Sequence, residues 1–254
     1  MLKHYPNARP GPMVAAPHPR QGSRGGAPRL SPPRRIAGSL LAILLIAIGV
    51  ESPAAGLPDT LASIKPGVVA VGTFMAVRAQ RHQLRGSGFA VSGSHVVTNA
   101  HVVAGQLDAD RRETFAVFLP KGGDQAEVRT ATLVRKDPAH DLALLKVSGA
   151  ALRPLRLAKS SDAREGATVA FTGFPILGAL GLFPATHRGI VSAIAPVVIP
   201  VGSGRDLKPE VIRRLNKPFD IFQLDITAFP GNSGSPLYDP DSGRVLGVIN
   251  SVFV

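Results

Sequence analysis

Three residues have the types and the order that acyl transfer from a peptide bond requires. They are His101, Asp141 and Ser233, with separations of 40 and 92 residues. A serine hydroxyl becomes a nucleophile when a neighbouring imidazole accepts its proton. A carboxylate then holds the imidazole in the correct tautomer and stabilises its protonated form. The order His, Asp, Ser matches one known arrangement of such a triad.

Each of the three residues also has an ordinary structural interpretation. His101 ends the apolar run VVTNAHVV, where a single histidine is more often a hydrogen-bonded core residue. Asp141, in DPAHDLALL, resembles a turn or cap residue. Ser233 lies in FPGNSGSPL, whose Gly, Asn, Ser and Pro are the commonest turn residues. The same glycines permit positive φ and close approach of a ligand, as a nucleophile loop needs, so this stretch alone leaves both interpretations open.

Short β-type segments make up most of the sequence after Leu57 and must position these residues. The predicted strands are Val68–Phe74, Gly88–Ser92, His95–Thr98, Thr114–Leu119, Ala126–Val134, Leu142–Val147, Thr168–Thr172, Gly189–Ile194, Phe222–Ile226, Ser235–Tyr238 and Val245–Val254. Helical patterns are limited to Asp59–Ile64 and Lys208–Leu215. A stretch without periodicity, Gly149–Ser161, divides the strands into two groups. The pattern predicts an all-β fold of two antiparallel barrels, over 57–150 and 160–254.

The N-terminal segment has a different composition. Residues 1–35 are rich in Pro, Gly and Arg and are predicted to be a disordered basic tail. An uncharged apolar run follows over 36–50, shorter than the about 20 residues of a spanning helix. Its basic flank favours a signal h-region or a signal anchor over a core helix. The remainder is then predicted to be exported to the periplasm or cell envelope, with the tail in the cytoplasm.

Charge and cysteine content exclude several classes of protein. The net charge is +12, but seven of the 29 Lys and Arg residues and none of the 17 acidic residues lie in the first 50 positions. The mildly basic remainder carries no nucleic-acid-binding motif, so no nucleic-acid partner is expected. The sequence has no cysteine, which excludes disulfides, thiolate metal sites and a cysteine nucleophile. The histidines lack metal-ligand spacing, and neither a metal nor another cofactor is predicted.

The three motifs together resemble a known family. TNAHVV around His101, HDLALLKV around Asp141 and GNSGSPL around Ser233 are similar to chymotrypsin-fold serine endopeptidases of the HtrA/Deg group. Gly86-Ser87-Gly88-Phe89 and Arg188-Gly189-Ile190-Val191-Ser192 also match that group. The resemblance covers about residues 57–254 and implies two six-stranded barrels with the active site in the cleft between them.

The resemblance implies a role for each residue. Ser233 attacks the peptide carbonyl, His101 acts as general base and then general acid, and Asp141 orients His101. The N–H groups of Gly231 and Ser233 form the oxyanion hole. The implied partners are polypeptide substrates, in unfolded or misfolded envelope proteins, and further copies of the chain in a homo-oligomer such as a trimer.

Two differences from related proteases refine these expectations. Digestive-type relatives have an Asp before the serine that pairs with a newly cut N-terminal amine, whereas Asn232 is neutral. Loop ordering is therefore expected instead, in 173–186 and 201–219. Glutamyl endopeptidases place a His after the serine strand, but here Asn250 occupies that region. Thr227, Ala228 and Asn250 predict an uncharged pocket for small or medium apolar side chains.

The family pattern usually continues with another strand, a short helix and a peptide-binding PDZ domain. The printed sequence ends at Val254 without them, so the second barrel is expected to be incomplete. Two alternative functions remain at this stage. One is a non-catalytic peptide-binding module, or an inactive truncated protease, that uses the same cleft. The other is a protein that residues 36–50 anchor in the membrane. Its basic tail would bind anionic lipid or an acidic partner.

Overall fold

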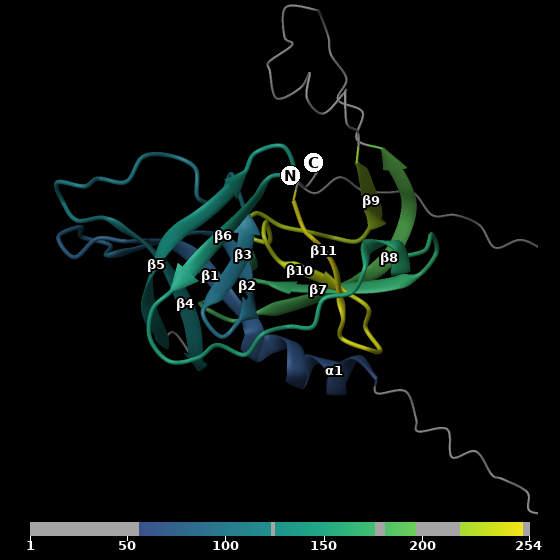
Figure 1. Ribbon diagram of the computed structural model, residues 1–254. Coiled ribbons are helices and arrows are strands. Elements are labelled where there is room, and N and C mark those ends of the chain that lie inside the picture. The colour runs from purple at the N-terminus through teal and green to yellow at the C-terminus, as the bar shows by residue number, and fades with distance from the viewer. Residues whose placement is uncertain (1–55, 123–124, 176–180, 197–218, 251–254) are drawn as a thin grey trace, which may run out of the picture. The chain divides into compact units, whose positions relative to one another are not determined.

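A computed structural model describes residues 56–122, 125–175, 181–196 and 219–250 (Figure 1). The predicted basic tail, the apolar run 36–50 and the helix candidate 208–215 lie outside these residues. Residues 176–180 of the predicted loop 173–186 and residues 201–218 of the predicted loop 201–219 lie outside them too. None of the helices in the described ranges combines the length and the apolar character needed to cross a membrane.

A short helix opens the described part of the chain. Helix α1 spans Leu57–Ile64 and is followed by the single 3₁₀ turn η1, Lys65–Gly67. The predicted helix Asp59–Ile64 is confirmed, with a start two residues earlier. Pro58 lies in the first turn, where the missing N–H of proline has no helical partner to lose. Thr60 and Ile64 turn to the protein interior and are buried.

The next six strands form a closed antiparallel barrel in the order β1-β2-β3-β6-β5-β4. They are β1 Val68–Phe74, β2 His82–Ser92, β3 His95–Asn99, β4 Thr114–Gly122, β5 Gln125–Asp137 and β6 Leu142–Val147. The six predicted strands of this half are confirmed, and several are longer than predicted. Closure removes exposed sheet edges, and alternate apolar residues such as Val71, Val96 and Leu145 fill the interior.

The second group of strands forms a five-stranded antiparallel sheet in the order β11-β10-β7-β8-β9. They are β7 Thr168–Gly173, β8 Ala185–Pro196, β9 Asp220–Asp225, β10 Pro236–Tyr238 and β11 Val245–Val248. In Figure 1 this sheet curls beside the first barrel. Together they confirm the predicted two-barrel, all-β fold class, with the second half not closed within the described residues.

The last strand, predicted over Val245–Val254, is shorter in the structure. Strand β11 ends at Val248, and the backbone of Ile249 then bonds to the segment that carries the serine. Ile249 N–H donates to Ser235 O at 2.9 Å, and Ile249 O accepts from Gly234 N–H at 2.8 Å. The apolar run therefore continues past the strand because it supports a loop. Residues 251–254 lie outside the described ranges.

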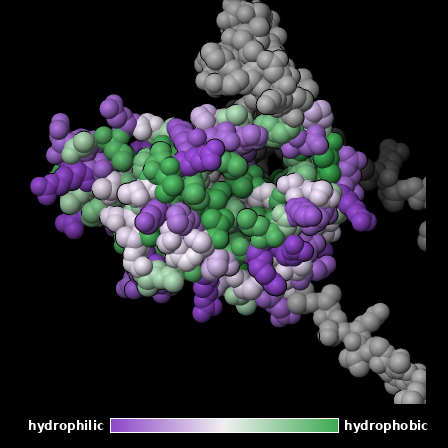
Figure 2. Space-filling model, viewed as in Figure 1, coloured by the Kyte–Doolittle hydropathy of each residue, from purple (hydrophilic) through white to green (hydrophobic). Residues whose placement is uncertain are grey.

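A shared apolar cluster joins the two halves. It contains Phe89 and Phe118 from the barrel and Phe174, Tyr238 and Val245 from the second group, all buried. The Tyr238 hydroxyl bonds Thr172 Oγ1 at 2.8 Å, and burial raises the pKa of Tyr238. Figure 2 shows polar side chains over most of one face and apolar ones gathered in its middle, where the halves meet.

An ion pair fastens two loops at one end of the barrel. Arg78 Nη1 and Glu113 Oε1 lie 3.0 Å apart, and the Glu113 side chain is only 7% exposed. Hydrogen bonds from Thr73 and from the Asp108 amide, together with Arg78, lower the pKa of Glu113 below its ordinary 4.5. Burial opposes this shift. A carboxylate with a lowered folded-state pKa stabilises the fold above its unfolded pKa and loses that contribution as the pH falls.

Glu113→Gln is therefore expected to destabilise the protein at neutral pH. It is also expected to make the free energy of unfolding depend less on pH in the acid range. The wild type should keep the Glu113 contribution above about pH 4.5 and lose it as the pH falls through the lower folded pKa. Urea unfolding of both proteins between pH 3 and 7, about the range in which carboxylates titrate, measures the difference. A stability gap between them that stays constant across this range would contradict the assignment.

Candidate active site

His101 and Asp141 are brought together by the pairing of two strands. His101 follows β3 by two residues and Asp141 directly precedes β6, and these strands pair antiparallel with Asn99 opposite Leu142. The His101 Nδ1–H donates to Asp141 Oδ2 at 2.6 Å, and the His101 backbone N–H donates to Oδ1 at 2.9 Å. The backbone carbonyl of Asp141 accepts from Ala100 N–H at 3.0 Å. The side-chain carboxylate and the backbone carbonyl of Asp141 therefore both bond to the segment that carries His101.

This pair has the geometry of an oriented general base. A carboxylate that accepts from Nδ1–H keeps the proton on that nitrogen and leaves Nε2 free to accept another. The His101 side chain is 48% exposed, whereas that of Asp141 is 15% exposed. The imidazole therefore faces solvent, where a substrate can reach it, and its orienting carboxylate is largely covered. Asp141 has a positive φ of 52°, uncommon for a residue with a side chain and enriched at functional sites.

Ser233 lies on a tight turn, residues 229–234, here called the serine turn. Asn232 N–H donates to Phe229 O at 3.0 Å, and Gly231 has φ of +100°. Proline at the second position and a positive φ at the third are the signature of a type II turn. Gly234 also has a positive φ, +89°. The glycines noted in the sequence thus occupy the two positions where a Cβ would be strained.

The two predicted oxyanion donors lie on this turn. Within the described ranges, the structure records no hydrogen bond donated by the backbone N–H of Gly231 or of Ser233. Their carbonyls, by contrast, are bonded: Gly231 O accepts from Ser87 Oγ–H and Ser233 O accepts from Ser87 N–H. Fixed carbonyls with unused amides are what an oxyanion hole requires, because donors must be held in place before charge develops.

The Ser233 hydroxyl donates to the backbone carbonyl of Asn250 at 3.0 Å. No bond from Ser233 Oγ to His101 is recorded among the described residues. Catalytic hydrogen bonds are often absent without substrate and form in the reactive complex. The structure therefore brings the backbone carbonyl of Asn250, predicted as a pocket residue, against the Ser233 hydroxyl.

The other predicted pocket residues lie just before the serine turn. Thr227 is exposed, and Ala228 is half-buried against the apolar cluster of the second sheet. Sequence reasoning missed their aromatic neighbours: His187 of β8 stacks on Phe171 at 4.8 Å and touches Phe229 at 5.7 Å, centroid to centroid. Burial lowers the pKa of His187. No spacing signal links these rings, because they come from three separate segments.

The remaining histidines of the described ranges have structural partners. His140 Nδ1 lies 2.8 Å from Asp137 Oδ2, so its partner is not Asp141. Residues 138–141 form a turn, in which the neighbouring His140 and Asp141 bond different partners. His95 bonds Ser92, and His82 packs on Phe74. The described residues contain no group of three or more His, Cys, Asp or Glu that would hold a metal ion.

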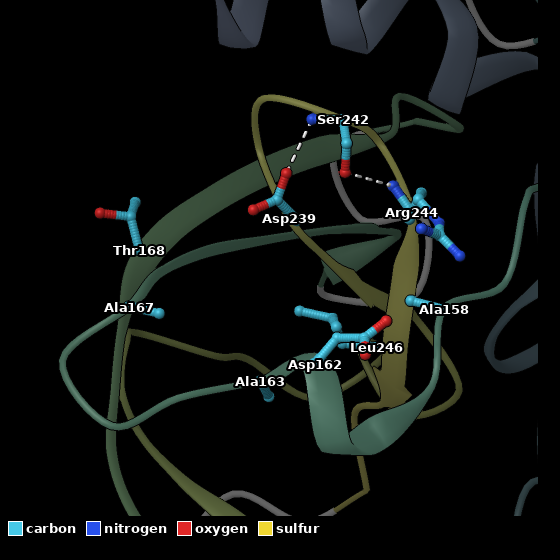
Figure 3. Close-up of a pocket in the computed structure, with 9 residues that line it drawn as sticks. All are labelled: Ala158, Asp162, Ala163, Ala167, Thr168, Asp239, Ser242, Arg244 and Leu246. Carbon is cyan, nitrogen blue, oxygen red and sulfur yellow. Dashed lines mark hydrogen bonds between the residues drawn. The ribbon is translucent and has the colours of Figure 1, made fainter.

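A small pocket elsewhere on the second half does not contain the triad (Figure 3). Its polar lining is engaged in a turn, since Asp239 Oδ1 accepts from Ser242 N–H at 2.7 Å. The lining residues are Ala158, Asp162, Ala163, Ala167, Thr168, Asp239, Ser242, Arg244 and Leu246. We assign it no chemistry.

Comparison with known proteins agrees with this architecture. The family model of the trypsin-like peptidase domain matches residues 86–248. A probable periplasmic serine endoprotease, DegP-like, of Pseudomonas fluorescens is 36% identical over 177 residues, which are 69% of this chain and 31% of that protein. A serine protease of Mycobacterium tuberculosis is 32% identical over 205 residues, covering 81% of this chain and 45% of that protein. The chain thus spans about a third to a half of these relatives.

Solved structures of proteases have a similar fold. The active form of the Rv3671c protease from M. tuberculosis aligns with a TM-score of 0.58 and 29% identity, over 80% of this chain and 78% of that one. The crystal structure of Deg5 aligns with a TM-score of 0.57 and 27% identity, over 77% of this chain and 84% of that one. The chain therefore belongs to the trypsin-like peptidase family, within the HtrA group of chymotrypsin-fold serine proteases.

Proposed function

We propose that this protein is a serine endopeptidase that uses a triad of His101, Asp141 and Ser233. The observation that carries the proposal is the doubly bonded His101–Asp141 pair in a chain that also presents a serine on a glycine-stabilised turn with unused amides. A core histidine would be buried. The aspartate of a local turn bonds a histidine close to it in sequence, as Asp137 does with His140, whereas Asp141 bonds a histidine 40 residues away and its side chain is only 15% exposed. The structural alternatives for these residues therefore fit less well.

In the proposed reaction, Ser233 Oγ forms a bond to the scissile carbonyl carbon while His101 Nε2 takes its proton. The carbonyl oxygen becomes an oxyanion, which the Gly231 and Ser233 amides stabilise. Collapse breaks the C–N bond, and His101 returns the proton to the leaving amine. Water then hydrolyses the acyl-enzyme by the same steps. Asp141 remains ionised and stabilises the imidazolium.

Substrate and place of action are also proposed. Relatives named periplasmic serine endoproteases support an exported protease, and we propose unfolded or misfolded envelope polypeptides as its substrates. Residues 36–50 are then a signal or signal-anchor segment. Thr227 and Ala228, which precede the exposed Phe229, and Asn250, whose carbonyl bonds Ser233, support a preference for small or medium apolar side chains. A homo-oligomer, such as a trimer, is proposed from family resemblance alone.

A fluorophosphonate probe tests the proposed nucleophile directly, because it reacts with activated serines and not with ordinary hydroxyls. The full wild-type chain is expected to be labelled in one place, and Ser233→Ala is expected to abolish both labelling and casein hydrolysis without unfolding. Hydrolysis that survives in folded Ser233→Ala would rule out the assigned nucleophile. Absent labelling in folded wild type would favour a non-catalytic peptide-binding module.

A further inference from the structure

Ser87 lies in the middle of β2 and is completely buried, with 0% exposure. Its hydroxyl donates to Gly231 O at 2.8 Å and accepts from Phe174 N–H at 2.9 Å. Its backbone N–H donates to Ser233 O at 2.8 Å, and its backbone carbonyl accepts from Thr98 Oγ1 at 2.7 Å. One residue of the first barrel thus contacts the serine turn, the end of β7 and the strand that leads to His101.

The two carbonyls that Ser87 holds belong to the residues whose amides form the proposed oxyanion hole. The Ser87 hydroxyl fixes the carbonyl end of the 231–232 peptide, and Phe229 O fixes its N–H end. Gly231 has no side chain to restrict its rotation, so these bonds determine where its own N–H points. Without the hydroxyl, the turn can change between type I and type II geometry, which reorients that N–H.

The strand that carries Ser87 packs closely against the serine turn. A Cβ at Gly234 would lie 2.0 Å from Ser87 O, and a Cβ at Gly86 would lie 2.9 Å from Ser233 O. The two segments are therefore in backbone contact. Removal of the hydroxyl leaves the buried Gly231 O and Phe174 N–H without partners, which favours rearrangement of the turn.

We propose that Ser87 is a positioning residue for the oxyanion hole, and that its hydroxyl holds the serine turn in the type II form. This inference rests on the proposed endopeptidase function. Ser87 does not touch the substrate; it acts through Gly231 and Ser233. The first barrel then supplies not only the general base but also the group that keeps the oxyanion donors in place.

The test compares kcat and KM for a fluorogenic peptide, with active sites titrated from the acylation burst. Ser87→Ala is expected to lower kcat by about tenfold to 10²-fold, somewhat less than the loss of a direct oxyanion donor. KM should stay within about twofold, because the ground-state carbonyl depends little on the oxyanion hole. Affinity for a peptide aldehyde, whose adduct carries the oxyanion, should fall in parallel with kcat.

Two further variants separate position from packing. Ser235→Ala is the matched control, since Ser235 is also 0% exposed but its Oγ has no partner in the described structure; its kcat should stay within about twofold of wild type. Ser87→Cys keeps a side chain of similar shape with a weak donor and should behave like Ser87→Ala. It carries the test if the alanine variant does not fold.

The outcomes are distinguishable. Hydrolysis that persists in Ser233→Ala overturns the proposed function itself. If hydrolysis needs Ser233 but Ser87→Ala and Ser87→Cys match wild type in kcat, only the positioning role of Ser87 is overturned. Equal losses in Ser235→Ala, or failure of both Ser87 variants to fold, would likewise assign Ser87 to packing alone.

Discussion

Asp141→Asn is expected to lower kcat by about 10⁴-fold while the protein stays folded. In the wild type the His101 backbone N–H donates to Asp141 Oδ1 at 2.9 Å. The amide oxygen of the variant can still accept this bond, so the local fold persists. The bond at 2.6 Å between His101 Nδ1 and Oδ2 loses its charged acceptor. An amide NH₂ facing Nδ1 favours the tautomer with the proton on Nε2, and that nitrogen can no longer accept the Ser233 proton. Single-turnover acylation measures the loss.

Asp137→Asn is a control of the same chemical type, four residues away. Asp137 also pairs with a histidine, His140, at 2.8 Å, and that histidine is 48% exposed, as His101 is. The bond to His140 lowers the pKa of Asp137, so the variant removes a real interaction. Its kcat should nevertheless stay within about twofold of wild type, since surface pairs contribute little. A comparable loss in both variants would show that the effect is structural.

Gly234→Ala is expected to destabilise the fold by about 4 kcal/mol or more, a size reached by few single substitutions. Gly234 has φ of +89°, and an added Cβ would lie 2.0 Å from Ser87 O and 2.6 Å from Thr98 Oγ1. Both contacts are in the buried joint between barrel and serine turn, so backbone must move. Urea unfolding measures the stability loss, and activity should fall with it because the serine turn shifts.

Gly105→Ala separates the cost of a positive φ from the cost of the close contact with Ser87 and Thr98. Gly105 has nearly the same φ, +91°, but an added Cβ would meet nothing within 4 Å. It should therefore cost about 1 kcal/mol, the usual penalty of a left-handed backbone for a residue with a side chain. If Gly234→Ala were no worse than Gly105→Ala, the close contact between the two halves would be wrong.

The strands and the triad order were accessible from the sequence because both depend on local patterns. Short runs of apolar and β-branched residues identified the segments that became β1, β6 and β7, and the pairing of β3 with β6 then required His101 and Asp141 to meet. The end of β11 was not accessible: the apolar run after Val248 looks like strand, but Ile249 bonds to the serine segment instead. Apolar periodicity does not distinguish those partners.

The details of the active site were less accessible. The Gly-Ser-Gly segment around Ser87 was noted only as a family-like motif, because its partner Gly231 lies 144 residues away. The bond from Ser233 to Asn250 O depends on one rotamer and on where the chain passes after β11. Such contacts follow from the docking of the two halves, which no single segment specifies.

The bond between Ser87 and Gly231 has a consequence for biosynthesis. It closes a loop of 144 residues, and contacts this distant in sequence form late because their entropy cost comes first. The first barrel can pair all its strands before the serine turn is synthesised, and the oxyanion donors are fixed only when both halves have docked. Under the proposed function, a nascent chain is therefore expected to gain activity only after its two halves have docked.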